Sequence, residues 1–493
     1  MTAAAPPSFE WSAEDIRRAG YRAIDLLAEH LASMRAAPVF HPVPAELSGA
    51  AFASVPPELG ATVDDVWHEL SRRVLPFPFG NGHPRFFGWV NSPPAVISVL
   101  AAAIAAAMNP SVAGGNHAAV YIEHEVLSWF KQMLGFPVDA GGLLVSGGST
   151  GALTALAVAR HHTCARRGWR IREVGFQDDQ ARARLLVYGT SQAHGCHQKA
   201  VELLGLGRNQ LRTVPCDDDL RMNPDVLDAM LARDVAAGHV PMAVVASAGT
   251  VNTGVIDPLN AIADVCARHG VWLHIDGAYG APAILLSDYA PMLAPVARAD
   301  SIALDPHKWL YVPVDAGLVV VKDASAMRDA FSLVPPYLRT DGREHGVQGP
   351  PWFAEFGFEQ SRPFRALKVW TAMKYFGLDG YRALLGHDVA CAKHLRERVK
   401  STAGLELWRT SDLSIVCFRA VPTTQDRPEE ADTFNRRILE DVQLGGRVFL
   451  SSTVLAERFW LRACVVNPRS TLSDVDTLID EVLDTAQRLS SGA

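Results

Sequence analysis

Two charged residues stand where the sequence predicts buried strands to end. Asp276 closes the apolar run VWLHID, and Lys308 comes three residues after the run SIALD. An unpaired charge is costly to bury, so each residue needs either a partner of opposite charge or a chemical purpose. A lysine amine can condense with an aldehyde, and a carboxylate can stabilise a positive charge on a neighbouring group. Together the two residues indicate a reactive site.

Polar residues also follow three other apolar runs. Gly148 and Ser149 lie in VSGGSTGAL, directly before a predicted helix, where freed backbone amides can bind an anion. This loop lacks the glycine spacing of dinucleotide-binding or triphosphate-binding loops. His194 follows the run LLVYG, and Thr250 follows MAVVASAG. Taken alone, each of these residues is explained as simply by a structural turn or loop.

The five groups together match the needs of a single cofactor. Pyridoxal 5'-phosphate (PLP) requires a lysine for its aldehyde and a carboxylate that keeps its ring nitrogen protonated. It also requires a neighbour for its flat ring and an anion-binding loop for its phosphate. Five polar groups at successive strand ends therefore predict a PLP site. No metal site is expected, because the cysteines and histidines lack metal-binding spacing.

The elements that would carry these residues follow a repeated strand, loop and helix order from about residue 140. The strands are short, continuous apolar runs, as expected when helices cover both faces of a parallel sheet. Residues at the carboxyl ends of such strands meet at one edge, where ligands bind. The sequence therefore predicts an α/β fold with a mostly parallel central sheet.

The two ends of the chain differ from this central part. A predicted helix after Ser12 precedes a proline-rich stretch, which indicates either an arm that packs on a partner subunit or a flexible leader. Beyond about residue 375, helices and strands indicate a smaller α+β unit. We therefore expect an N-terminal helical arm and dimerisation segment (1–90), a large PLP-binding α/β domain (91–375) and a small C-terminal α+β domain (376–493).

Composition narrows the class of protein. The chain has 493 residues and a net charge of -7, which argues against nucleic-acid binding. Its seven cysteines are scattered without CxxC spacing, as in a cytoplasmic protein with reduced thiols. No secretory signal is visible, and the apolar run 95–110 is too short and too interrupted for a membrane span. We expect a soluble cytoplasmic protein.

The motifs resemble those of the group II PLP-dependent amino-acid decarboxylases, which include the aromatic-L-amino-acid, histidine and glutamate decarboxylases. The resemblance covers nearly the whole chain. It rests on RRAGYRAIDLLAEHL, HPRFFGW, SQAHGCHQKA, LHIDGAYG, DPHKWL, RPFRALKVW and WLRACVVNPRSTLSDVD. It implies the aspartate-aminotransferase-like fold (PLP fold type I) and an obligate homodimer with active sites at the interface.

The same resemblance implies a role for each matching residue. Lys308 would be the Schiff-base lysine and Asp276 the partner of the pyridinium nitrogen. His194 would stack on the cofactor ring and help to orient the substrate carboxylate. The other cofactor-binding positions would be Ala278 on the opposite ring face, Thr250 near the phenolic or lysine side, Gly148 and Ser149 at the phosphate, and His307 beside them.

The reaction implied is decarboxylation of an L-amino acid to an amine and carbon dioxide through a quinonoid intermediate. In aromatic members of the family, a lid tyrosine is thought to return the proton. Counting along the glycine- and proline-rich stretch 334–365 places that position near Phe353 or Pro351, and neither carries a proton. Tyr337 or His345 could replace it. Alternatives are an aldehyde synthase, which forms aldehyde, ammonia and peroxide, and a catalytically silent homologue that acts as a binding protein.

Substrate choice is less determined by the sequence. The resemblance places Trp89 and Ser92 at the pocket mouth and Trp352 and Phe353 on the lid. An aromatic amino acid is favoured, while diamino and acidic substrates stay open. Asp305 replaces the asparagine common before PHKW, and because a carboxylate beside a phosphate is unfavourable unless paired, we leave it out of the cofactor set.

Overall fold

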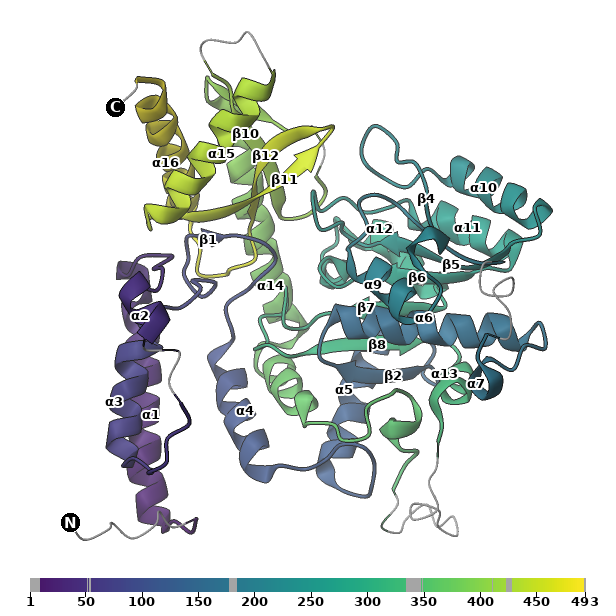
Figure 1. Ribbon diagram of the computed structural model, residues 1–493, viewed down its shortest axis with the longest axis horizontal. Helices are drawn as coiled ribbons and strands as arrows, with labels where there is room; N and C mark the ends of the chain where they lie inside the picture. The colour runs from purple at the N-terminus through teal and green to yellow at the C-terminus, as the bar shows by residue number, and fades with distance from the viewer. Residues whose placement is uncertain are drawn as a thin grey trace.

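The computed structural model describes residues 9–50, 52, 55–176, 184–333, 347, 349–409, 411–422 and 428–491. Within these ranges the chain forms one sheet of seven strands and one of five. The larger sheet and its helices fill the right half of Figure 1, and the smaller sheet lies above and to the left of them. The long helix α14 (Arg365–Ser401) runs between the two parts.

The seven-stranded sheet has the order β2-β8-β7-β6-β5-β3-β4. β8 pairs antiparallel with both of its neighbours, and all other pairs are parallel. The strands are β2 (Gly141–Val145), β3 (Leu185–Gly189), β4 (Leu211–Thr213), β5 (Val240–Ser247), β6 (Trp272–Asp276), β7 (Ser301–Leu304) and β8 (Gly317–Val321). The predicted α/β fold with a mostly parallel sheet is therefore confirmed.

Helices enclose this sheet. Every residue of β2, β3, β7 and β8 is buried. Because neighbouring side chains of a strand point to opposite faces, both faces must be covered, which explains the continuous apolar runs. The surrounding helices are α5 (Ala118–Leu134), α6 (Gly148–Ala165), α7 (Ile171–Val174), α9 (Cys196–Leu203), α10 (Pro224–Ala236), α11 (Leu259–His269), α12 (Ala290–Leu293), α13 (Ala324–Phe331), η2 (Arg208–Gln210), η3 (Ala281–Leu285), η4 (Ala294–Arg298) and η6 (Phe353–Glu355).

The five-stranded sheet combines segments from both ends of the chain. Its order is β1-β11-β12-β10-β9, and β1 pairs parallel with β11 while the other pairs are antiparallel. Its elements are β1 (Phe86–Phe87), β9 (Leu405–Leu407), β10 (Ile415–Ala420), β11 (Phe449–Leu455), β12 (Arg458–Cys464), and the covering helices α15 (Pro428–Leu444) and α16 (Leu472–Ser491). A strand from the predicted N-terminal segment thus completes the C-terminal sheet.

Helix α14 crosses the domain boundary that we expected between residues 375 and 376. Gly377 interrupts it there, with a φ of 61° that glycine adopts without strain from a Cβ atom. α14 packs on α4 (Val96–Met108) and α5 and also contacts β10 and α16. The helix therefore connects the two sheets, and the division into three domains stays a prediction.

The N-terminal helices expose an unusual amount of apolar surface. α1 (Ala13–Ser33) and α3 (Val63–Arg73) stand beside one another at the left of Figure 1, clear of both sheets, and η1 (Met34–Ala36) and α2 (Ala45–Ala50) follow α1 in the chain. Leu26 is the one residue of α1 that is buried. Exposed apolar side chains lie on α1, α3 and α4: Ile16, Tyr21, Ile24, Val66, Ile104 and Met108. Of the helices that the structure describes, none is long and apolar enough to cross a membrane.

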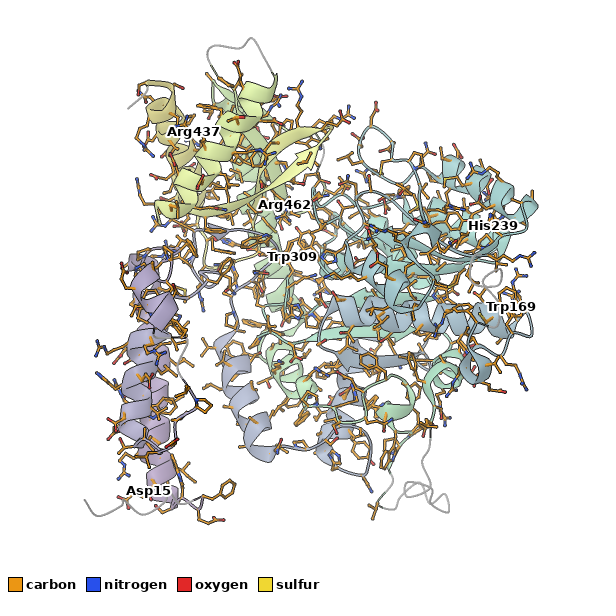
Figure 2. All side chains as sticks on the ribbon, in the orientation of Figure 1. Asp15, Trp169, His239, Trp309, Arg437 and Arg462 are labelled. Carbon is orange, nitrogen blue, oxygen red and sulfur yellow. The ribbon has the colours of Figure 1, made fainter. Side chains whose placement is uncertain are left out.

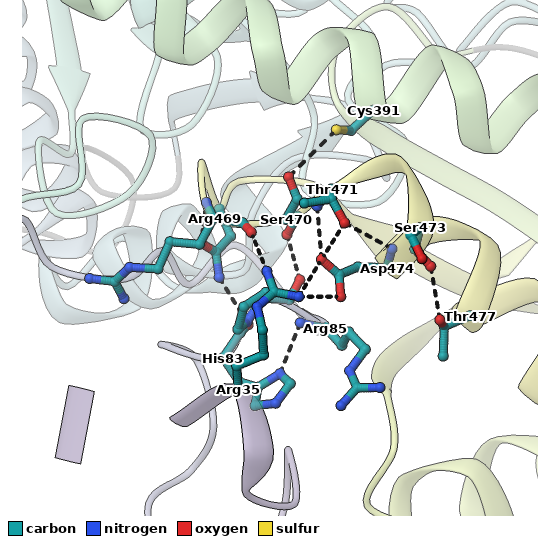
Figure 3. Close-up of polar contacts among 12 residues, drawn as sticks. Arg35, His83, Arg85, Cys391, Arg469, Ser470, Thr471, Ser473, Asp474 and Thr477 are labelled. Carbon is teal, nitrogen blue, oxygen red and sulfur yellow. Dashed lines mark hydrogen bonds and ion pairs between the residues drawn. The ribbon is translucent and has the colours of Figure 1, made fainter. Parts of the chain in front are cut away.

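A polar cluster attaches the N-terminal segment to the start of α16 (Figure 3). Thr471 and Asp474 form a capping box: the Asp474 amide donates to Thr471 Oγ1 at 3.2 Å, and the Thr471 amide donates to Asp474 Oδ2 at 2.9 Å. Arg35 adds an ion pair of 2.9 Å to Asp474 Oδ1 and donates to the Arg469 carbonyl. Ser470 donates to the Pro84 carbonyl. One cap therefore stabilises α16 and holds the N-terminal segment in place.

We expect Arg35→Ala to destabilise the fold by about 1–2 kcal/mol, because it removes a charge-assisted bond to the nearly buried Asp474. Chemical denaturation measures this loss, and limited proteolysis should cleave residues 1–90 earlier than in the unmodified chain. Arg447→Ala is a matched control, since the Arg447 side chain pairs with Glu481 of the same helix. Equal proteolysis of the two variants would contradict the role of Arg35.

Candidate active site

Five strands of the large sheet end at one cavity. β2, β3, β5, β6 and β7 are followed there by loops that line a space of about 610 Å³. The cavity is the size expected for a cofactor with a small substrate. It brings together seven of the eight predicted cofactor-binding residues: Gly148, Ser149, His194, Asp276, Ala278, His307 and Lys308. The strand-end rule applied to the sequence therefore identified the correct edge of the sheet.

The glycine-rich loop after β2 turns directly into α6. A Cβ atom on Gly147 would lie 3.1 Å from the His307 ring, and one on Gly148 would lie 3.0 Å from Asp305 Oδ2. A Cβ atom on Gly317 would come within 2.5 Å of the Gly147 backbone. Glycine is required because three segments approach one another closely here. The first amides of the eighteen-residue helix α6 are consequently accessible to an anion in the cavity.

Lys308 pairs with the aspartate three residues before it. Its Nζ lies 2.9 Å from Asp305 Oδ2, and the Asp305 side chain is almost fully buried. Burial works against the ammonium, but Asp305 and then Asp276 outweigh it and raise the pKa of Lys308 above its ordinary value. Asp305, which we had left out of the cofactor set, therefore lies in the cavity wall with a cationic partner. Its Oδ1 has no hydrogen-bond partner among the described residues.

Asp276 obtains its cationic partner from a residue that sequence reasoning missed. His197 Nε2 lies 2.9 Å from Asp276 Oδ2, and the Ala278 amide donates to Asp276 Oδ1 at 3.1 Å. Burial alone would raise the pKa of Asp276, but the His197 bond and charge hold it well below its usual range. The signal was present in the motif HGCHQKA, whose second histidine lies in the first turn of α9.

His194 and Cys196 line the cavity next to this pair. The Cys196 amide donates to His194 Nδ1 at 3.2 Å. A hydrogen bond with the Cys196 side chain raises the pKa of His194, so its ring is more readily charged than a free imidazole. His307 Nδ1 accepts from the Ala316 amide at 3.1 Å, and burial lowers the pKa of His307. The cavity is thus lined by one histidine whose raised pKa favours the charged ring, His194, and by one whose lowered pKa favours the neutral ring, His307.

The backbone that carries Lys308 is anchored on α14. Trp309 Nε1 and the Tyr311 hydroxyl donate to Asp388 Oδ2 at 2.9 and 2.8 Å. The Trp309 ring also stacks on Tyr279 with 5.1 Å between ring centroids. Figure 2 labels Trp309 at the junction between the large sheet and α14. These contacts fix the segment on the carboxyl side of the lysine.

Two predicted residues lie close to the cavity without lining it. Thr250 is buried, and its hydroxyl lies 3.1 Å from that of Thr253, because a tight turn directs it inward; Gly249 and Val251 form the cavity wall instead. Ser92 is also buried and donates to the His307 carbonyl at 3.3 Å. The expected cofactor contact of Thr250 and substrate contact of Ser92 stay predictions, since neither side chain lines the cavity of this chain. Trp89 does line the mouth, with its ring stacked on Phe79.

Two of the residues expected on the lid pack against the body of this chain. Phe353 is only 2% exposed and packs under the Arg362 guanidinium at 5.0 Å and against the His124 ring at 4.5 Å. Trp352 packs on Gly114, where a Cβ atom would overlap its ring. Within this chain, Phe353 and Trp352 are therefore held by the body of the protein, and their place on a lid over the substrate stays a prediction. Tyr337 and His345 lie outside the described residues.

The opposite wall of the cavity comes from the small sheet, which sequence reasoning also missed. Arg462 on β12 is buried and donates to the carbonyls of Val251 and Trp89 at 2.7 and 3.2 Å. It also donates to Ser451 Oγ on β11. Figure 2 labels Arg462 where the small sheet meets the large one. One guanidinium therefore joins the loop after β5, the segment after β1 and the small sheet around the mouth.

These residues fit PLP. Lys308 can attach to the aldehyde, Asp276 can hold the ring nitrogen, and the amides at the start of α6 can bind the phosphate. His194 and Ala278 line the cavity between these two ends. When bound, PLP supplies the electron sink that the amino-acid side chains lack.

Comparisons with known proteins agree with this assignment. The family described as "Pyridoxal-dependent decarboxylase conserved domain" matches residues 52–421. An aromatic-L-amino-acid decarboxylase of Bacillus atrophaeus is 33% identical over 98% of each chain, and a phenylacetaldehyde synthase of Arabidopsis thaliana is 26% identical over 92% of each. A rice TDC structure, solved with PLP and tryptamine, aligns over 98% of this chain and 100% of its own, with a TM-score of 0.90 and 28% identity. The chain therefore belongs to the PLP-dependent amino-acid decarboxylases, as its lysine, aspartate and glycine loop had indicated.

Proposed function

We propose that this enzyme decarboxylates an aromatic L-amino acid to the corresponding amine and carbon dioxide. The observation that carries the proposal is the convergence of Lys308, Asp276 and the start of α6 on one cavity. Lys308 would hold the cofactor, Asp276 would stabilise positive charge at its ring nitrogen, and Gly148 and Ser149 would bind its phosphate. His194 would lie against the ring and help to orient the substrate carboxylate.

Asp305 has a separate proposed task. It keeps Lys308 as an ammonium at 2.9 Å before the cofactor is attached. The 2.9 Å ion pair also fixes the position of the amine in the cavity wall. Asp305 is therefore proposed to hold the Lys308 ammonium in place rather than to touch the phosphate.

The preference for an aromatic substrate is supported by the relatives and by the mouth of the cavity. The bacterial relative is named for aromatic amino acids, and the rice structure contains tryptamine. In this chain the exposed Trp89 ring lies at the mouth, stacked on Phe79 at 5.1 Å between ring centroids. A flat substrate side chain could extend this stack. Diamino and acidic substrates lack that interaction.

Amine is the proposed product rather than aldehyde. The sequence argument for an aldehyde synthase rested on Phe353, and in this chain that side chain is buried beneath Arg362. The likeness to the phenylacetaldehyde synthase is weaker than the likeness to the bacterial decarboxylase. We therefore keep aldehyde formation as an outcome of the experiment below.

The enzyme is further proposed to be a cytoplasmic homodimer. All seven cysteines are free, as is usual in a reducing compartment. A second copy of the chain is the proposed partner of the apolar side chains exposed on α1, α3 and α4. α1 and α3 stand clear of the sheets, and the exposed apolar residues of all three helices would otherwise lie in water.

Lys308→Ala should abolish the visible absorbance of the bound cofactor and lower activity roughly a thousandfold or more, because the amine that attaches the aldehyde is lost. Borohydride reduction of the unmodified holoenzyme followed by peptide mapping should label Lys308. Lys308→Arg is the matched control, since it keeps the charge beside Asp305 but cannot attach the cofactor. A reducible adduct in Lys308→Ala at the same site would sink the assignment.

A panel of aromatic, diamino and acidic L-amino acids tests the substrate and the product together. We expect kcat/KM to be roughly tenfold or more higher for aromatic substrates, since only these can stack at the mouth. Amine, aldehyde, ammonia and peroxide should each be quantified, with Lys308→Ala as the blank. Amine without peroxide is the expected result. Stoichiometric aldehyde and peroxide would establish the aldehyde synthase instead.

Light scattering should give a molar mass near twice that of the 53.3 kDa chain. Ile104→Glu on α4 should shift the protein toward the monomer, because it places a charge in the apolar surface that a second copy would cover. Val138→Glu is the control, since Val138 is more exposed still, at 85% against 58% for Ile104, and lies between α5 and β2 and not on α1, α3 or α4. A monomeric unmodified protein would refute the proposed dimer.

A further inference from the structure

We propose that His197 is a positioning residue that keeps Asp276 ionised and correctly oriented to receive the PLP ring nitrogen. The inference rests on the proposed role of Asp276 and adds to it a residue that prepares the carboxylate before the cofactor binds. His197 acts through Asp276, and the described cavity wall does not include it.

The pair is formed by two elements that are distant in the chain. His197 lies in the first turn of α9, and Asp276 is the last residue of β6. Their side chains are 1% and 15% exposed, and Nε2 lies 2.9 Å from Oδ2. The other ring nitrogen, Nδ1, has no hydrogen-bond partner among the described residues. Asp276 is therefore the group that accounts for the burial of a polar ring at this position.

The two contacts of Asp276 fix the plane of its carboxylate. Oδ2 faces His197, and Oδ1 accepts the Ala278 amide at 3.1 Å. An ionised carboxylate offers about four acceptor positions, so these two bonds leave capacity for a donor in the cavity that Asp276 lines. A carboxylate held in this way need not reorient when the cofactor arrives.

The arrangement also keeps two ion pairs separate from one another at this site. Lys308 pairs with Asp305, and His197 pairs with Asp276. Without His197, the Asp276 carboxylate would retain Lys308 as its nearest cationic neighbour, since both act on each other's pKa. A lysine drawn to Asp276 would occupy the position intended for the ring nitrogen. His197 thus leaves Lys308 with Asp305.

The charged and titratable groups that face His197 support an imidazolium. They are Asp276 and His274 from β6 and Cys196 from α9. Burial alone would lower the pKa of His197, but the bond to Asp276, together with the Cys196 side chain, raises it to about 10. Burial, together with the positive charge of His197, lowers the pKa of His274 to about 3, so His274 stays neutral. At neutral pH the site therefore contains an imidazolium–carboxylate pair.

The pair should affect the stability of the cofactor-free enzyme in a defined pH window. A histidine with a raised pKa stabilises the fold below its unfolded value, near 6.5, and this stabilisation is lost as pH rises toward 10. Asp276 has a lowered pKa, so its share is present above about 3.9 and is lost as pH falls. The melting temperature of the cofactor-free enzyme should exceed that of His197→Gln most between about pH 5 and 7, and less at pH 10.

The decisive test is a double-mutant cycle read by PLP affinity. His197→Leu should raise the Kd for PLP by about tenfold or more. His197→Gln, whose amide can take the place of Nε2, should have a Kd between those of His197→Leu and the unmodified enzyme. Neither substitution should change the Kd further in an Asp276→Asn background. His269→Gln is the matched control. His269 at the end of α11 makes a similar 2.8 Å bond through Nε2 to Asp228 of α10, and neither residue lines the cavity.

Each result separates the two proposals. If Asp276→Asn leaves PLP affinity unchanged, the proposed role of Asp276 fails. If Asp276→Asn weakens binding while both His197 variants bind as the unmodified enzyme does, only the role of His197 fails. An equal loss in both backgrounds would assign His197 to packing alone, and tighter binding would show that it competes with the ring nitrogen; either overturns the inference. Should His197→Leu not fold, His197→Gln carries the cycle.

Discussion

The structure depends on how it neutralises charge at the ends of buried strands. A carboxylate at the end of β6 and an amine after β7 are needed for chemistry, and both would be costly to bury alone. The fold supplies one counter-ion to each, His197 for Asp276 and Asp305 for Lys308, at 2.9 Å in both cases. Because Asp276 and Lys308 each have their own counter-ion, they need not pair with one another, and both can still interact with a molecule in the cavity.

The parallel sheet brings these groups to one edge, and close packing fixes the positions of the loops that carry them. Five strands deliver their loops to a single edge, but the loops fit only because glycine occupies the points of closest approach, at Gly147, Gly148 and Gly317. On the other side of the lysine, Trp309 and Tyr311 are tied to Asp388 of α14. The reactive lysine is therefore held between the large sheet and the helix that leads to the small one.

Sequence patterns predicted the parts of this site that depend on local order along the chain. The strand ends, Lys308, Asp276, His194 and the glycine loop follow from apolar runs and the residues after them. His197 and Asp305 were missed as partners because pairing depends on which side chains meet across elements. Counting through an irregular stretch could not show that Arg362 and His124 would enclose the Phe353 ring. Nor could the strand pattern show that a turn directs the Thr250 hydroxyl toward Thr253.

The mouth of the cavity and its reactive residues come from different parts of the fold. The mouth is built by the small sheet and the N-terminal segment, whereas the reactive residues follow strands of the large sheet. Trp89 follows β1, which pairs with β11, and Arg462 on β12 donates to the Trp89 carbonyl and to Ser451 on β11. The N-terminal segment that carries Trp89 is in turn held to α16 through Arg35 and Asp474. The mouth of the cavity therefore depends on how the small sheet and the N-terminal segment pack, whereas Lys308 and Asp276 follow strands of the large sheet.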